Sequence, residues 1–255
     1  MTKLFDERDF DLLSGWSRTD AKEMLLHFKV TMERLCDRLD RLRVFRNAHR
    51  ARGAKEETFW HLGSPQVDEG GNLVAYQYYQ PARRHFYIRN HGGAGEIQFN
   101  VGFFGDRDDD IARSARVAMG FSFGGRFIAD IGSLGTVKTP WFFRGFKEVL
   151  RQDAALRAQM EQAIRTCGLI FHADRSVAEP AAMLDRLLAL DEEALPGSEM
   201  TWVALERFVR WSDSPADLMD MDRFVESHCR PVFEGCYPVW EAVQKHTRRH
   251  YGSVI

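Results

Sequence analysis

Hydrophobic residues recur at alternating intervals of three and four along the stretch from Leu25 to Leu42. Such spacing forms a narrow apolar seam along one side of an α-helix, as in coiled coils. Thr19 and Asp20 are good helix-capping residues, so the sequence predicts a long helix that begins near Thr19 and ends before Gly53. The seam suits packing on the protein's own sheet or on a second copy of the chain, and both alternatives stay open. Its apolar positions are Leu25, Phe28, Met32, Leu35, Leu39 and Leu42.

Between residues 72 and 132 the period of the pattern changes to two, and turn residues recur at short intervals. Alternation of apolar and polar positions is typical of strands with one buried face. Because the connecting turns are short, and Gly124-Gly125 suits a tight hairpin, we expect an antiparallel meander. Its expected strands are 72–80, 84–91, 96–103, 117–123 and 127–131.

The helical period returns after Pro140. The expected helices are 141–150, 154–166, 178–190, 200–211, 215–228 and 238–250, with one short strand at 168–172. The sequence therefore predicts an α+β fold with an N-terminal long helix, a central antiparallel β-meander of about five strands and a helical C-terminal half. We expect residues 1–175 to form the α+β core domain, which includes covering helices, and residues 176–255 to form a helical C-terminal subdomain.

Composition narrows the class of protein. The chain has 255 residues, of which 44% are hydrophobic and 28% charged, and its net charge of −2 excludes a molecule that is basic throughout. Its 4 cysteines are irregularly spaced, which does not resemble a disulfide framework. The first residues are acidic where a signal peptide would be basic and then apolar, and no apolar run is long enough to cross a membrane. We therefore expect a cytoplasmic protein without a membrane association.

One predicted hairpin concentrates chemically capable side chains. If residues 92–95 form its bend, His91 lies opposite Glu96, Arg89 opposite Gln98, and Tyr87 opposite Asn100, all on one face. The other face is apolar and would join the core. A carboxylate beside an imidazole supports acid–base chemistry, and arginine binds phosphate with two parallel hydrogen bonds. The alternative is that this polar face is solvated and carries no function.

If the protein is an enzyme, we expect metal-assisted hydrolysis of a phosphodiester. Glu96 would be a metal ligand or base, His91 an acid or base, and Arg89 a phosphate clamp, with Gln98 beside them. Tyr87 and Asn100 would bind substrate. The cofactor of such chemistry would be a divalent cation. The three residues Glu96-Ile97-Gln98 resemble the acid-x-lysine step of the restriction-endonuclease-like nucleases, with glutamine in the lysine position, which is too little to assign the family.

The densest basic run of the chain ends in the stretch Arg43–Lys55, whose expected substrate-binding residues are Arg43, Arg46, Arg50 and Arg52. Arginines with aromatic residues nearby are typical of surfaces that bind phosphates and stack on bases, although such a run on a helix end is more often just a solvated face. Weaker features are alternating aspartates in the loop around Asp108, as in calcium loops, and a Cys229, Cys236, His246 and His250 set with zinc-ligand chemistry but unusual spacing. The basic end of the last helix is explained by its favourable interaction with the helix dipole.

These observations predict a cytoplasmic protein that engages a phosphate-bearing partner, with nucleic acid as the favoured partner. Its enzymatic form would be a metal-binding hydrolase, a nuclease of phage-defence or restriction type. One alternative is a protein without catalysis that oligomerises or docks a partner through the Leu25 to Leu42 seam. Another is a small-ligand binder that uses a recess over Ala118 and Gly120 on the sheet.

Overall fold

A computed structural model places two compact units, each built from separate stretches of the chain. Unit 1 consists of Met1–His91, Asn100–Met119 and Phe208–Arg230, and unit 2 of Gly92–Phe99, Gly120–Arg207 and Pro231–Ile255. Each is described by itself. The structure describes residues 3–15, 21–46, 58–62, 65–67, 73–76, 79–80, 85–90, 96–104, 115–123, 139–171, 178–190 and 203–252. The predicted division into 1–175 and 176–255 stays a prediction.

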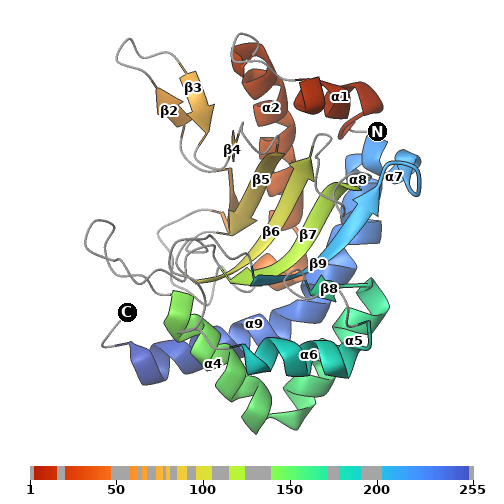
Figure 1. Ribbon diagram of the computed structural model, residues 1–255. Coiled ribbons are helices and arrows are strands. Elements are labelled where there is room, and N and C mark those ends of the chain that lie inside the picture. The colour runs from red at the N-terminus through yellow and green to blue at the C-terminus, as the bar shows by residue number, and fades with distance from the viewer. Residues whose placement is uncertain are drawn as a thin grey trace. The chain divides into compact units, whose positions relative to one another are not determined.

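The main sheet has the strand order β1-β5-β6-β7-β9-β8, with β4 paired to β5, and β2 and β3 form a separate two-stranded sheet (Figure 1). The described registers, β1 with β5, β4 with β5, β5 with β6, β8 with β9 and β2 with β3, are all antiparallel. The strands are β1 (Trp60–His61), β2 (Pro65–Val67), β3 (Leu73–Tyr76), β4 (Tyr79–Gln80), β5 (His85–Asn90), β6 (Ile97–Phe104), β7 (Ala115–Phe123), β8 (Ile170–Phe171) and β9 (Val203–Arg210). The α+β class is therefore confirmed. The expected strand at 127–131 lies outside the described residues.

Strand β9 corrects the helix that the sequence predicts at 200–211. Its alanine, leucine, glutamate and arginine residues favour helices, but the first four side chains of the strand are all buried. Gly120 allows the β9 backbone to come close, because an ideal Cβ at Gly120 would lie 2.2 Å from the carbonyl oxygen of Leu205. Burial in the sheet therefore outweighs the local preference of these residues.

In unit 1 the first helix is α1 (Glu7–Gly15), which is short, and α2 (Ala21–Asp40) follows it. The seam positions described on and just after α2 are all buried in this unit, namely Phe28, Met32, Leu35, Leu39 and Leu42. At the end of α2, Asp40 Oδ1 accepts hydrogen bonds from the backbone N–H groups of Phe59 and Trp60, at 2.9 and 3.0 Å. The expected helix at 215–228 is divided into α7 (Pro215–Met219), α8 (Met221–Phe224) and a π-helical turn, η2 (Val225–Cys229).

Helices dominate unit 2. Three of them agree closely with those expected from the sequence, whereas the last begins at Arg230, well before the expected start at 238, and contains Pro238 in its interior. The helices are α4 (Thr139–Gln152), α5 (Ala154–Cys167), α6 (Pro180–Ala189) and α9 (Arg230–Tyr251), whose first residue belongs to unit 1. Asp153 separates α4 from α5 and caps α5, since its side chain accepts hydrogen bonds from Ala155 N and Leu156 N. Gly168 ends α5 at a positive φ of 62°, a conformation that glycine adopts without strain.

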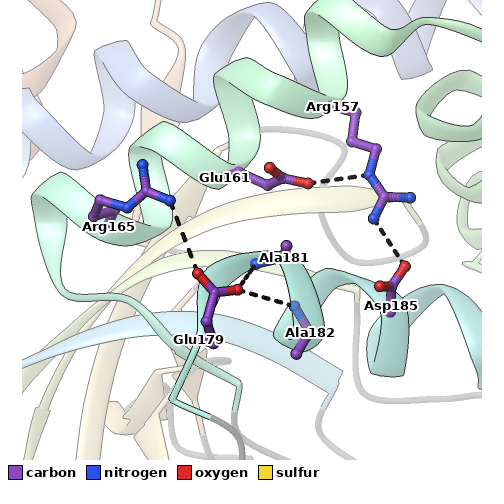
Figure 2. A network of polar contacts seen from close by, with 7 residues as sticks. All are labelled: Arg157, Glu161, Arg165, Glu179, Ala181, Ala182 and Asp185. Atoms are coloured by element: carbon purple, nitrogen blue, oxygen red, sulfur yellow. Dashed lines mark hydrogen bonds and ion pairs between the residues drawn. The ribbon is translucent and has the colours of Figure 1, made fainter.

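Polar contacts join α5 to α6 at the surface of unit 2 (Figure 2). Arg157 binds Glu161 at 3.0 Å and Asp185 at 2.8 Å, and Arg165 lies 3.9 Å from Glu179. Glu179 also caps α6, because its Oε2 accepts a hydrogen bond from Ala181 N at 2.8 Å. Ion pairs that are this exposed contribute little to stability individually. The network therefore affects the relative orientation of α5 and α6 more than it stabilises their packing.

None of the described helices is both long enough and apolar enough to span a membrane. The cytoplasmic location expected from the sequence stays a prediction.

Candidate functional site

The hairpin register differs by two residues from the one expected. Arg89 lies opposite Asn100 instead of Gln98, and Tyr87 lies opposite Gly102 instead of Asn100. A slip of two keeps every side chain on its own face of the sheet, so Ile88 still meets an apolar partner, Val101. Alternation of apolar and polar positions therefore cannot distinguish these two registers. The expected register is wrong for the described pairs, and the bend expected at 92–95 lies outside the described residues.

The described side chains on the polar face of this hairpin are buried or half-buried. Arg89 and Asn100 are buried in unit 1, and Glu96 and Gln98 are buried in unit 2. Tyr87 is half-buried, and His91 lies outside the described residues. The two described members of the expected trio, Arg89 and Glu96, are therefore buried, and the place of the His91 imidazole stays a prediction. The catalytic roles expected for Glu96, His91, Arg89 and Gln98 stay predictions.

The structure bears differently on the predicted phosphate-binding surface and on the predicted recess of the sheet. Arg43 and Arg46 are exposed in unit 1, as a phosphate-binding surface requires, whereas Arg50 and Arg52 lie outside the described residues. The recess expected at Gly120 is filled by protein, because Leu205 O and Glu206 Cα would lie 2.2 and 2.9 Å from a Cβ there. The small residue at this position admits the backbone of a neighbouring strand, and the small-ligand alternative stays a prediction.

Unit 2 holds a different candidate, an open hollow of about 530 Å³ between the α4–α5 corner and α9. Lys245, His246, Arg249 and His250 line it from a single face of α9, and Asp153 lines it from the start of α5. We call this group of five residues the α9 hollow. Its volume lies within the range of small-molecule sites.

The charges of the α9 hollow favour an anion. Arg249 has no hydrogen bond or ion pair with any part of the chain that the structure describes. Lys245 pairs with Glu241 at 3.1 Å, but its side chain is 72% exposed and its ammonium remains available to a ligand. Asp153 Oδ1 already accepts hydrogen bonds from two backbone N–H groups, each at 3.0 Å. Among the residues that line the hollow, two permanent cations, Lys245 and Arg249, therefore face one carboxylate, Asp153, while Glu241 balances Lys245 from outside the lining.

A carboxylate holds one imidazole at the edge of the hollow. Glu148 Oε2 lies 2.7 Å from His246 Nε2, and Tyr251 donates a hydrogen bond of 2.6 Å to Glu148 Oε1. Partial burial raises the pKa of Glu148, but the hydrogen bonds from Tyr251 and His246 outweigh it, so this pKa lies below its usual value. The His250 ring lies 4.4 Å from the His246 ring, which places two imidazoles together.

The zinc-ligand set is not assembled by the part of the chain that the structure describes, where no group of three or more potential metal ligands occurs. His246 binds Glu148, and the two cysteines, Cys229 and Cys236, are buried free thiols. The basic residues at the end of α9 were visible in the sequence, but their effect on the helix dipole was a sufficient explanation. The spacing of these residues in the sequence could not show that the α4–α5 corner lies beside them and forms a hollow with them.

No protein-family model matches the chain, and no curated protein or solved structure is significantly similar to it.

Proposed function

We propose that the protein binds a phosphate-bearing ligand in the α9 hollow, and that this ligand is nucleic acid or one of its nucleotides. The observation that carries the proposal is Arg249, a guanidinium without a partner among the described residues, beside Lys245 and two imidazoles in one open hollow. A guanidinium can donate two parallel hydrogen bonds to a phosphate, and lysine adds a compact positive charge.

The strength of such a contact is moderate and depends on salt. A hydrogen bond to a charged group contributes about 1.5–3 kcal/mol. Each phosphate that cations neutralise also releases counterions, so the logarithm of the affinity falls by about 0.7–0.9 per tenfold rise in salt. Steep weakening with salt is therefore an expected property of the α9 hollow.

Binding is a better proposal than metal-assisted hydrolysis at Glu96. Arg248 Nη2 donates a hydrogen bond of 2.9 Å to Glu96 Oε1, which neutralises the carboxylate. A divalent cation at Glu96 would lie next to a guanidinium, and that repulsion weakens metal binding. The nuclease chemistry expected from the sequence stays a prediction, which divalent-dependent turnover lost in Glu96→Ala would support.

The experiment is fluorescence anisotropy of a labelled single-stranded oligonucleotide at several salt concentrations. Arg249→Glu should weaken binding at least tenfold, because it replaces a favourable charge with a repulsive one. Arg210→Glu is the charge-matched control, since Arg210 is exposed and belongs to unit 1. Equal affinity of wild type and Arg249→Glu would refute the proposal.

The same assay separates the α9 hollow from the basic run that the sequence suggested. If Arg46→Glu abolishes binding and Arg249→Glu does not, the phosphate lies on the exposed surface of unit 1 and the α9 hollow is not the site. The proposal expects the reverse order of effects.

A further inference from the structure

A chain of hydrogen bonds that begins at Tyr251 ends on one imidazole of the α9 hollow. Tyr251 donates to Glu148 Oε1 at 2.6 Å, and Glu148 Oε2 lies 2.7 Å from His246 Nε2. Helix α4 supplies the carboxylate, α9 supplies the tyrosine and the histidine, and all three residues belong to unit 2. The orientation of the His246 ring is therefore fixed by a contact between two helices.

The charge of Glu148 decides which ring nitrogen of His246 carries the proton. Partial burial raises the pKa of Glu148, but the hydrogen bonds from Tyr251 and His246 outweigh it, so this side chain is a carboxylate at neutral pH and only accepts hydrogen bonds. The His246 group that faces it is therefore an Nε2–H. In the neutral imidazole the other nitrogen, Nδ1, then carries a lone pair and can accept a proton.

This basic nitrogen is accessible. His246 lines the α9 hollow, and its side chain is 17% exposed. Its hydrogen bonding to the described part of the chain goes through Nε2, to Glu148. Nδ1 of His246 is also not among the polar atoms that the described residues bury without a partner. It therefore remains available to a ligand, as a general base must be.

The phosphate site lies beside this base. Arg249 follows His246 by three residues, so the two side chains are neighbours on one face of α9 and line the same hollow. A phosphate bound by the Arg249 guanidinium therefore lies next to the imidazole. Lys245, on the same face, adds positive charge that stabilises negative charge developing on the phosphate oxygens.

We propose that the α9 hollow cleaves single-stranded RNA, with His246 as the general base that activates the ribose 2′-hydroxyl. Nδ1 of His246 takes the proton of the 2′-hydroxyl, the 2′ oxygen forms a bond to the adjacent phosphorus, and the bond from phosphorus to the 5′ oxygen of the next nucleotide breaks. The leaving 5′ oxygen takes a proton from solvent water, and His246 returns its own proton to solvent. The products are a 2′,3′-cyclic phosphate and a 5′-hydroxyl end.

RNA fits this site better than DNA because its nucleophile is part of the substrate. The 2′-hydroxyl is already adjacent to the phosphate that Arg249 binds, and such proximity greatly accelerates a reaction. The protein then has to supply a base and a phosphate ligand, which His246 and Arg249 provide. DNA lacks this hydroxyl, so its cleavage would need a water molecule held in line by further groups. The inference rests on the proposed function, because the phosphate that reacts is the one bound in the α9 hollow.

The test incubates the full-length protein, in the presence of EDTA, with a labelled single-stranded RNA of mixed sequence and with DNA of the same sequence. We expect the RNA to be cleaved and the DNA to remain intact. Mass spectrometry of the fragments should find 2′,3′-cyclic phosphate ends. This comparison uses the wild-type protein, so it remains decisive if a substitution in the hollow prevents folding.

His246→Ala then assigns the activity to the base. It should lower kcat by about 100-fold or more, as expected for loss of a general base. Free imidazole should restore part of the rate, which a merely structural role of His246 would not allow. Because the variant is purified in the same way as the wild type, it also reveals any contaminating ribonuclease.

Tyr251→Phe tests the positioning of the base through Glu148. It should lower kcat several-fold and leave KM unchanged, because it removes a hydrogen bond to Glu148 and no contact with RNA. Tyr237→Phe is the matched control, since Tyr237 donates a hydrogen bond of 3.4 Å to Glu241 on the same helix and does not line the hollow. That control should keep the wild-type rate.

The outcomes distinguish this inference from the proposed function. RNA that binds in a salt-dependent way but is not cleaved would overturn the inference and keep the binding site. Failure of the protein to bind RNA or DNA would overturn both. Cleavage of DNA at the same rate would identify water as the nucleophile, and cleavage that persists in His246→Ala would place the activity elsewhere; either result would overturn the inference.

Discussion

The substitution Gly120→Ala tests strand β9, where the sequence predicted a helix. An ideal Cβ at Gly120 would lie 2.2 Å from Leu205 O and 2.9 Å from Glu206 Cα, both in the β9 backbone. Real Cβ atoms essentially never come within 3.0 Å of another heavy atom of this kind, so strand β9 would have to move by roughly 1 Å. Backbone in a hydrogen-bonded sheet cannot move as a flexible side chain can. We expect a net loss of about 2 kcal/mol after the usual gain from removing a glycine.

The assay is urea unfolding, with the free energy of unfolding compared between wild type and variants. Gly168→Ala is the matched control, because Gly168 has a positive φ of 62° but nothing within 4 Å of its added Cβ. That control should lose about 1 kcal/mol from backbone strain alone. If Gly120→Ala costs no more than Gly168→Ala, the backbone of β9 does not approach Gly120, and the helix expected at 200–211 becomes the better description.

Three further predictions concern stability and thiol chemistry. Glu148→Gln should reduce the free energy of unfolding by about 1 kcal/mol at pH 7. Because the folded-state pKa of Glu148 lies below its unfolded value, this contribution is complete above the unfolded value and is lost as pH falls through the folded one; urea unfolding at pH 7 and pH 3 checks it, and an equal deficit at both would contradict it. Burial raises the pKa of Cys36 and of Cys236, and all 4 thiols are buried, so a thiol reagent should label none rapidly before unfolding and all of them afterwards. Leu35→Asp should unfold unit 1 and not merely dissociate an oligomer, since Leu35 is fully buried there; circular dichroism with light scattering distinguishes loss of structure from loss of mass.

Local signals explain the part of the fold that could be predicted. Helix α5 begins after Asp153, whose side chain caps it, and ends at Gly168, and both residues are visible in the sequence. Strand β9 lacked such signals, because residues such as Leu205 and Glu206 favour a helix and the strand forms through long-range burial. The hairpin register failed for a third reason, since Ile88 finds an apolar neighbour in both registers that keep its face.

The sequence allowed the chemistry of the candidate site to be predicted, but not its position in the fold. Arginine as a phosphate ligand was expected, and Arg43 and Arg46 are exposed as that expectation requires. Arg249 was also visible, but the hollow around it depends on the α4–α5 corner, more than 90 residues away in the sequence. The sequence predicted that Glu96 is a catalytic residue on an exposed face of the sheet. Its contact with Arg248 could not be inferred from either residue alone.

The most direct test of the central claim is to observe the side chains of the α9 hollow while phosphate binds. Nuclear magnetic resonance can follow the imidazole signals of His246 and His250 and the Nε–H signal of Arg249 during titration with a 5′-phosphorylated dinucleotide. Their assignments come from His246→Gln, His250→Gln and Arg249→Lys. The account predicts that all three signals shift together and saturate with one affinity, and that the shifts diminish at high salt. Saturable shifts at Arg43 or Arg46, with the α9 signals unchanged, would contradict it.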